Sequence, residues 1–192
     1  MYGKTSAGVT RSPLIDADRR LVLSAGPETA VIEGRMFTAA NATKVATTAG
    51  VTAAWTGLCL SNLTDSGKNL IIREFGWGFM NAAETAGNIG LMTASIAAPA
   101  SVITTHNCLD GQAASAAVYA DDGATLVVPL QVRTCGEYGT AAISTYFNNG
   151  PHVYELDGSL VIPPGRTVAS YTTLATAVAC FQFYFIWEEV DV

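Results

Sequence analysis

Charged side chains are scarce in this chain of 192 residues. Asp, Glu, Lys and Arg make up 14% of the sequence, against about 25% in an average globular protein, while hydrophobic residues make up 49%. A monomer with so few charges would expose contiguous apolar patches. We therefore expect part of the surface to be buried in an oligomer or a larger assembly.

Basic residues are fewer still. Ten Lys and Arg stand against sixteen Asp and Glu, for a net charge of -6, and Arg19-Arg20 is the one adjacent basic pair. Binding to nucleic acid requires a basic stripe that neutralises phosphates. The composition therefore predicts no nucleic-acid partner.

Motifs that carry chemistry are also missing. Gly67-Lys68 is followed by Asn69 and preceded by Asn62 five residues before Gly67, so the phosphate-loop pattern GxxxxGK[ST] fails. With only two histidines, His106 and His152, a histidine-rich metal site is excluded. We predict no catalytic residue, no metal site and no cofactor, and we expect the chain not to be an enzyme.

The loop carboxylates leave one alternative open, and the cysteines favour a simple interpretation. Asp110, Asp121, Asp122 and Asp157 could meet at a Ca²⁺ site, but EF-hand spacing is absent and Asp is an ordinary turn residue. The four cysteines are far apart and form no CxxC pair, so we interpret them as reduced, mostly buried thiols; they are Cys59, Cys108, Cys135 and Cys180.

Long apolar runs are absent. No stretch of about 18 apolar residues exists, and the first residues, MYGKTSAGVTRSP, contain no apolar core of a signal peptide. We expect no membrane partner and synthesis in a reducing cytoplasm.

Short β-type runs separated by Gly, Pro, Asn and Asp dominate the rest of the chain. The runs that we interpret as strands are 20–24, 30–33, 35–38, 55–60, 68–79, 88–93, 125–134, 140–147, 153–156, 159–162, 166–173 and 178–188. The turn Pro163-Pro164-Gly165 separates two of them, and Pro129 marks an edge strand or a bulge. The spacing predicts an all-β fold, an antiparallel jelly-roll β-sandwich over residues 20–192. Residues 1–19 are predicted to form an extended N-terminal arm.

Two runs have informative faces. In the run 68–79 the core side is expected to be the one that carries Ile71, Arg73, Phe75, Trp77 and Phe79, and Gly76 and Gly78 suggest a bulge or a close sheet contact. In the last run the aromatic row is expected in the core, and it consists of Phe181, Phe183, Phe185 and Trp187. The opposite row is also apolar enough to need cover, so we predict that it forms a subunit interface, made by Cys180, Gln182, Tyr184 and Ile186.

Several segments resemble a group of tailed-bacteriophage virion proteins known as head decoration, cement or head-fibre proteins. They are LSNLTDSGKNLIIREFGWGF, GLMTAS, HNCLDG, DGSLVIPPGRTVASYTT and FYFIWEEV, within about residues 55–190. The C-terminal half is also similar in pattern to trimeric TNF/C1q-like jelly rolls. These resemblances imply a homotrimer on an icosahedral shell, bound to the major capsid protein and located in the virion after assembly in the bacterial host cytoplasm.

The arm is the expected shell contact, since a segment without a core of its own can order on its partner. The candidate arm residues are Tyr2, Lys4, Val9, Arg11, Leu14 and Ile15. The alternative function is a fibre- or tail-associated module that binds a host surface or a carbohydrate. An aromatic platform made by Trp55, Trp77 or Tyr119 near loop carboxylates would favour it.

Overall fold

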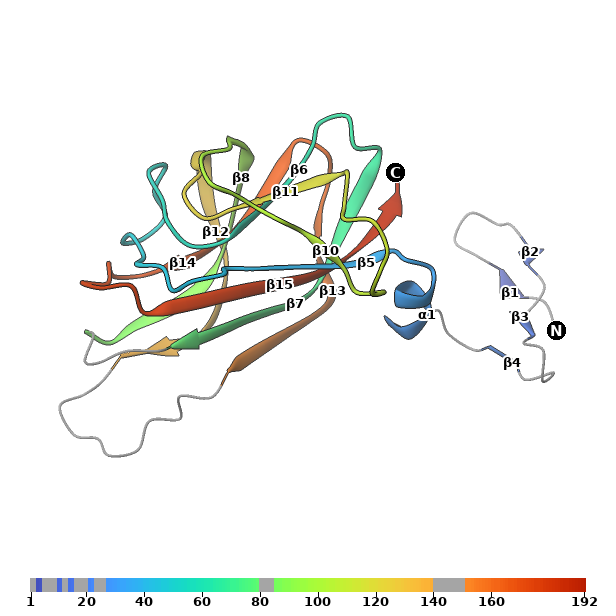
Figure 1. Ribbon diagram of the computed structural model, residues 1–192, viewed down its shortest axis with the longest axis horizontal. Helices are drawn as coiled ribbons and strands as arrows, with labels where there is room; N and C mark the ends of the chain where they lie inside the picture. The colour runs from blue at the N-terminus through green and yellow to red at the C-terminus, as the bar shows by residue number, and fades with distance from the viewer. Residues whose placement is uncertain are drawn as a thin grey trace.

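A computed structural model describes residues 27–79, 85–139 and 151–192, together with four two-residue strands near the N-terminus. Two antiparallel sheets pack face to face as a sandwich (Figure 1). The prediction of an all-β, jelly-roll-like sandwich is confirmed. The two sheets consist of β5 (Met36–Ala40), β6 (Cys59–Asn62), β7 (Lys68–Phe79), β8 (Gly87–Ala98), β9 (Val102–Ile103), β10 (His106–Asn107), β11 (Val118–Asp121), β12 (Thr125–Tyr138), β13 (His152–Ile162), β14 (Arg166–Thr172) and β15 (Phe181–Asp191).

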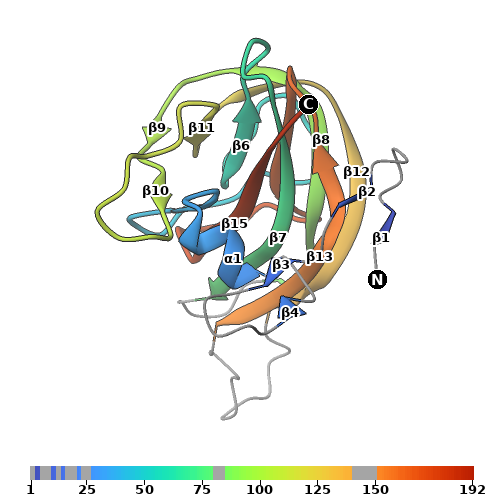
Figure 2. The same cartoon turned by 90° about the vertical axis from the view of Figure 1, so that its right-hand side faces the viewer.

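The order of strands is β10-β5-β15-β7-β13 in the five-stranded sheet and β12-β8-β14-β6-β11-β9 in the six-stranded sheet. Strands β9 and β10 are consecutive in the chain and lie at the same side of the sandwich. Strands β12 and β13 are the edge strands of the two sheets at the opposite side of the sandwich (Figure 2).

Strand β15 occupies the centre of the five-stranded sheet, between β5 and β7. Its aromatic row is at most 1% exposed, which confirms the expected core face. The ring of Phe75 on β7 lies 5.0 Å from that of Phe185 and 5.9 Å from that of Phe183, between centroids, within the range of favourable aromatic pairs.

The inward face of β7 changes within the strand. Leu70 and Ile72 are fully buried at its start, whereas Phe75 and Trp77 are buried further on. The register pairs Ile186 with Glu74 and Trp187 with Ile72, so Arg73 is an extra residue in a β-bulge. The expectation that Ile71 and Arg73 face the core is therefore wrong, because the bulge shifts the alternation by one residue.

The outer face of the six-stranded sheet is covered by the segment 41–58. Trp55 from this segment is 3% exposed and its indole N–H donates a 2.6 Å hydrogen bond to the carbonyl of Ser170. It forms a second apolar cluster with Cys59, Met92 and Tyr171 on the sheet. This face is thus closed by the chain itself.

Several local predictions need correction. The run 30–33 is not a strand: α1 spans Pro27–Ile32, and proline followed by Glu28 is typical of a first helical turn. The runs 153–156 and 159–162 form one irregular strand, β13. Pro129 does lie in an edge strand next to a register shift, as predicted.

The N-terminal arm contains two short strand pairs. Strand β1 (Gly3–Lys4) pairs with β2 (Thr10–Arg11), and β3 (Leu14–Ile15) pairs with β4 (Leu21–Val22). The second pair joins residues on both sides of the expected boundary at residue 20. Of the candidate arm residues, Tyr2 and Val9 lie outside the described residues, as does the predicted strand 140–147.

Candidate functional site

Two irregularities meet on the outer face of the five-stranded sheet. Arg73 bulges out of β7, and in the neighbouring β13 the register jumps from the pair Glu155–Glu74 to the pair Leu160–Ile72. Within that jump Asp157 has a φ of 45°, a conformation that costs free energy for a residue with a Cβ. Bulges are over-represented beside functional sites because they redirect side chains. This part of the sheet is therefore the first candidate site.

A cavity of about 320 Å³ opens beside the two bulges. We call it the bulge hollow. It is lined by Pro27, Val31, Met36, Arg73, Glu74, Cys108, Glu155, Asp157 and Ile186. One wall is apolar and comes from α1, β5 and β15, whereas the wall from β7 and β13 carries the charges. The hollow could therefore hold a side chain with an aliphatic stem and a cationic end.

Glu188 is the buried ionic centre of this face, with a side chain that is 7% exposed. It accepts hydrogen bonds from the guanidinium groups of Arg35 and Arg73, and Arg35 also binds Glu33 at 2.7 Å. Burial alone would raise the pKa of Glu188, but the hydrogen bonds and positive charges of the two arginines outweigh it and lower that pKa below its ordinary value of 4.5. Glu188 thus stays ionised and fixes both arginines.

Tyr184 and Glu74 form a second polar contact on the same face. The phenol O–H of Tyr184 donates to a carboxylate oxygen of Glu74. Burial, and then the hydrogen bond and charge of Glu74, raise the pKa of Tyr184. The phenol is therefore a fixed donor and not a base.

The hollow contains one potential nucleophile, Cys108. Burial raises the pKa of its thiol, which disfavours the reactive thiolate. Within the described ranges no group of three or more His, Cys, Asp or Glu side chains is arranged to hold a metal ion. The geometry of the bulge hollow therefore fits ion pairing with a cation better than bond-breaking chemistry.

A smaller hollow of about 250 Å³ lies further along the same face, around Gly78, Gln182 and Tyr184. We call it the glycine hollow. Its floor is open because a Cβ added to Gly78 would have no atom within 4 Å, whereas a Cβ on Gly76 would overlap the ring of Tyr184. The absence of a side chain at Gly76 thus lets Tyr184 lie flat over β7 and form the wall of the hollow.

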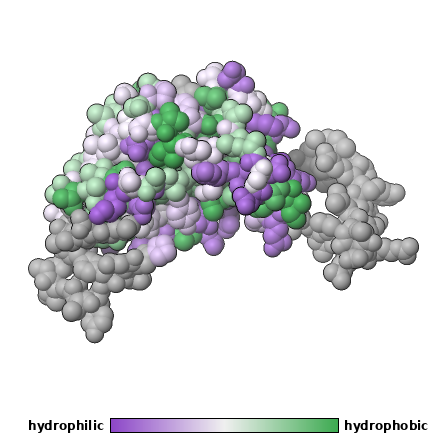
Figure 3. All heavy atoms as spheres, viewed as in Figure 1, coloured by the Kyte–Doolittle hydropathy of each residue, from purple (hydrophilic) through white to green (hydrophobic). Residues whose placement is uncertain are grey.

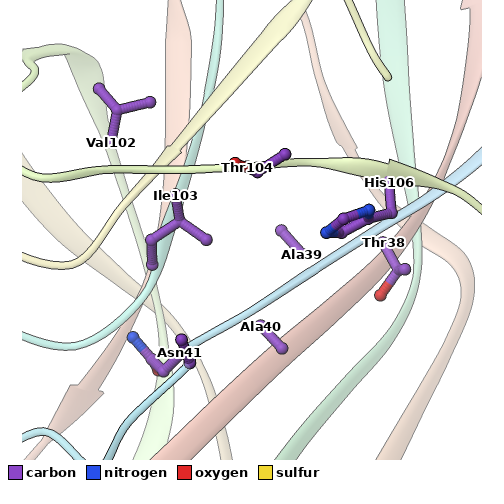
Figure 4. Close-up of a pocket in the computed structure, with 9 residues that line it drawn as sticks. Thr38, Ala39, Ala40, Asn41, Val102, Ile103, Thr104 and His106 are labelled. Atoms are coloured by element: carbon purple, nitrogen blue, oxygen red, sulfur yellow. The ribbon is translucent and has the colours of Figure 1, made fainter. Parts of the chain in front are cut away.

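A groove of about 560 Å³ runs between β5 and the segment that holds β9 and β10. Figure 4 shows Thr38 to Asn41 along one side and Val102 to His106 along the other. Its lining contains no Asp, Glu, Lys or Arg. Asn41 is already engaged, because its amide N–H₂ donates to Gly57 O and its amide oxygen accepts from Phe183 N–H, both at 3.0 Å. The groove thus offers shape but few polar groups.

The predicted interface residues do not all lie together. Gln182, Tyr184 and Ile186 are half-buried on the outer face, as expected from the alternation of β15. Cys180, which directly precedes β15, is fully buried in the core of its own chain. It cannot contact another subunit, and its assignment to the interface was wrong.

The structure does not bring the other candidate residues from the sequence together in one site. Trp55 and Trp77 are 3% and 4% exposed, so neither can form a ligand platform. Asp121 is fully buried and caps a loop by accepting hydrogen bonds from the backbone N–H groups of Ala100, Ser101 and Gly123 at 2.7–2.8 Å. None of the four cysteines, all within the described part of the chain, forms a disulfide.

Sequence reasoning missed an exposed apolar rim on the edge strand β12. The rim consists of Val127, Val128, Leu130 and Val132, which are 39–70% exposed. On β13, Val153 and Val161 are also exposed, but exposed Glu155 and Asp157 lie between them. The run LVVPLQV signals a strand with two apolar faces, and its Pro129 an edge strand or a bulge, but the run does not show which of its side chains stay exposed. On the face drawn in Figure 3, hydrophobic residues lie in separate groups among polar ones.

Comparison with protein-family models, with curated proteins and with solved structures found no match to this chain. Among the described residues, no helix has the length and hydrophobicity needed to cross a membrane.

The two strand glycines should respond differently to a methyl group. We expect Gly76→Ala to displace Tyr184 from Glu74 and to lower the free energy of unfolding by about 1–3 kcal/mol, as overpacking does. Gly78→Ala is the matched control, since its Cβ meets no atom within 4 Å. Denaturant unfolding of both variants checks this, and equal losses would contradict it.

Acid should weaken the Glu188 contacts. A carboxylate with a lowered pKa stabilises the fold above its unfolded pKa, and this stability is lost as the pH falls through the folded pKa. We expect Glu188→Gln to cost about 1–2 kcal/mol at neutral pH, given two part-exposed arginine partners. The gap to wild type should narrow as the pH falls below 4.5. Melting curves of both proteins across this pH range test the prediction, with the exposed Glu28→Gln as control. A difference in stability that does not depend on pH would contradict it.

Proposed function

We propose that this chain is a structural virion protein, a homotrimer that decorates and cements the head of a tailed bacteriophage. Two observations support the proposal. The sequence segments named above resemble head decoration proteins, and the exposed apolar rim on β12 favours burial against a protein partner. The rim is the observation that carries the assembly.

An aliphatic rim on an edge strand favours association. Leu130 is 59% and Val128 70% exposed, and they lie on the same strand. Unpaired strand edges and contiguous apolar patches are the parts of a sandwich that associate most readily. Covering the rim would remove apolar surface from water and stabilise an oligomer.

The rim is poorly suited to adding another strand. Pro129 has no N–H to donate, Val128 has a φ of 50°, and the pairing of β12 with β8 contains four register shifts. Edge strands that carry proline and bulges resist edge-to-edge pairing. We therefore expect the rim to contact a neighbouring subunit through its side chains, packed against the face of a sheet.

The glycine hollow provides a sheet face for that contact. Gln182 and Tyr184, two of the predicted interface residues, line it on the outer side of β15. Rim and hollow are different surfaces of one subunit, so a contact between them is heterologous and closes when three copies form a ring. Three arms then act together on the shell, which multiplies a weak single attachment.

In this proposal the arm contacts the major capsid protein through the candidate residues between Tyr2 and Ile15. The mature protein lies on the outer surface of the virion after assembly in the host cytoplasm. It needs no cofactor, since burial of apolar surface across subunits is the whole mechanism.

Polar substitutions in the rim should dissociate the oligomer. Burial of a leucine side chain contributes about 1.5–3 kcal/mol, so we expect Leu130→Ser to raise the dissociation constant about ten-fold or more. Val102→Ser is the matched control, because Val102 is 65% exposed on β9, away from the rim. Light scattering on dilution measures the mass, with 20.0 kDa per chain. A wild-type protein that stays monomeric at micromolar concentration would contradict the trimer.

Attachment to the head is tested separately. Electron microscopy of phage heads assembled with and without this chain should show added density at three-fold positions and greater resistance to heat only when it is present. Intact heads with the same density in both preparations would contradict the decoration role.

A further inference from the structure

We infer that the groove between β5 and the segment of β9 and β10 binds an extended, uncharged segment of a partner protein, which adds to the open edge of β5 as a further strand. The contact does not use the rim on β12. The inference therefore stands whether the protein is a monomer or a trimer and whatever shell it binds.

The groove opens where the pairing of β10 with β5 stops. Only Thr38 and Phe37 of β5 have partners in β10. On the N-terminal side of His106 the chain leaves β5, and Ile103 already pairs within the six-stranded sheet. Figure 4 shows the two segments close together at His106 and diverging from there. Strand β5 continues to Ala40, and the groove of about 560 Å³ lies beside this end of the strand.

The backbone of Ala40 faces the groove. In an antiparallel ladder the N–H and C=O of one residue point to the same neighbour, and successive residues alternate. Asn41 N–H donates to Phe183 O on β15 at 3.0 Å, whereas Met36 O accepts from Cys108 N–H, just after β10, at 2.8 Å. Ala40 has the same phase as Met36, so its N–H and C=O point away from β15. Ala40 is exposed, and no described residue pairs with it on that side.

Strand β9, on the other side of the groove, has an open edge as well. It is the last strand of the six-stranded sheet. Ser101 O accepts from Asp122 N–H at 3.3 Å, so by the same alternation Val102 and Thr104 turn their N–H and C=O away from β11. Val102 is 65% exposed, and Thr104 is exposed too. An extended segment in the groove thus meets open backbone groups on both walls.

The lining defines the chemistry of the segment. It contains no Asp, Glu, Lys or Arg, and its one amide side chain, Asn41, is already engaged. Recognition therefore depends on the backbone, as it does when a peptide adds a strand to a sheet edge. The small side chains of Ala39, Ala40 and Ala42 leave room for larger ones on the segment. A charged side chain would lose water here without an opposite charge to pair with.

Other edge strands in the described part of the chain carry features that oppose pairing. Strand β12 has Pro129 and four register shifts, and β13 has a register jump beside the exposed Glu155 and Asp157. Residues 102–105 contain neither proline nor charge. Proteins commonly protect the edges that are not used for pairing, so this unprotected edge favours a binding role. A second copy could offer only the same edge, with a strand of two residues, so a longer segment of a partner fits the groove better.

Synthetic peptides test the mode of binding. The probes are peptides of about eight residues with blocked ends, which alternate Thr with Ala, Val, Leu or Phe. We expect at least one of them to bind, and N-methylation of every second residue to weaken its binding about ten-fold, as the loss of two hydrogen bonds implies. Amide hydrogen exchange should slow at Ala40 in the complex but not at Leu130 on β12. Failure of all these peptides to bind at millimolar concentration, or equal binding of the N-methylated form, would overturn the inference.

A pair of lysine variants locates the site. Thr104→Lys places a charge in the groove outside the pairing of β9 with β11, and Val161→Lys, at an exposed position of β13, is the matched control. We expect Thr104→Lys to weaken peptide binding about ten-fold and Val161→Lys to leave it unchanged. Equal binding by the two variants would contradict the site. If Thr104→Lys instead lowers the mass of the protein alone in light scattering, a second copy fills the groove and the inference is overturned.

Discussion

The packing of the β15 aromatic row against β7 is the constraint on which the rest of the structure depends. Four large side chains occupy every second position of β15 and are almost completely removed from water: Phe181, Phe183, Phe185 and Trp187. Truncating one such buried aromatic typically costs about 3–5 kcal/mol, a large part of the stability of a domain. A shift of one residue would turn the whole row outward. The register of the five-stranded sheet is therefore strongly determined.

This constraint also decides what the outer face displays. Once Phe183 and Phe185 are inside, Gln182, Tyr184 and Ile186 must be outside. On β7 the buried side chains stand at even positions before the bulge, Leu70 and Ile72, and at odd positions after it, Phe75 and Trp77. The single extra residue between them is Arg73, which reaches Glu188 from this position. The bulge that keeps both pairs of side chains in the core thus also places Arg73 beside Glu188 on the outer face.

Sequence periodicity predicted the long strands well, because many alternating residues distinguish their two faces. The bounds of β7 were obtained to the residue, and the aromatic row of β15 was assigned to the correct face. It failed for α1, because six residues hold too few turns to show a helical period. Periodicity also assigned Ile71 and Arg73 to the wrong face, because a strict alternation of two does not reveal a single inserted residue.

The candidate sites were less predictable than the fold, for a different reason. The bulge hollow joins Pro27, Cys108 and Asp157 from distant parts of the chain, and the glycine hollow joins Ala40, Gly78 and Gln182. No local pattern contains such a juxtaposition. Pro129 indicated an edge strand or a bulge, but the apolar residues around it do not show which of their side chains stay exposed and which pack on the sandwich.

The two hollows divide the outer face by chemistry. The end near α1 carries carboxylates and arginines, for which a charged partner is favourable and an aliphatic one is not. The end near Gly78 is neutral and floored by glycine, and it favours an apolar side chain that fills space. An aliphatic rim docked on the charged end would desolvate Glu74 and Glu155 without compensation, which is costly. The sheet therefore discriminates between its partners by what each would leave unpaired. In this way a chain with few charges can select its partners through the outer face of the five-stranded sheet.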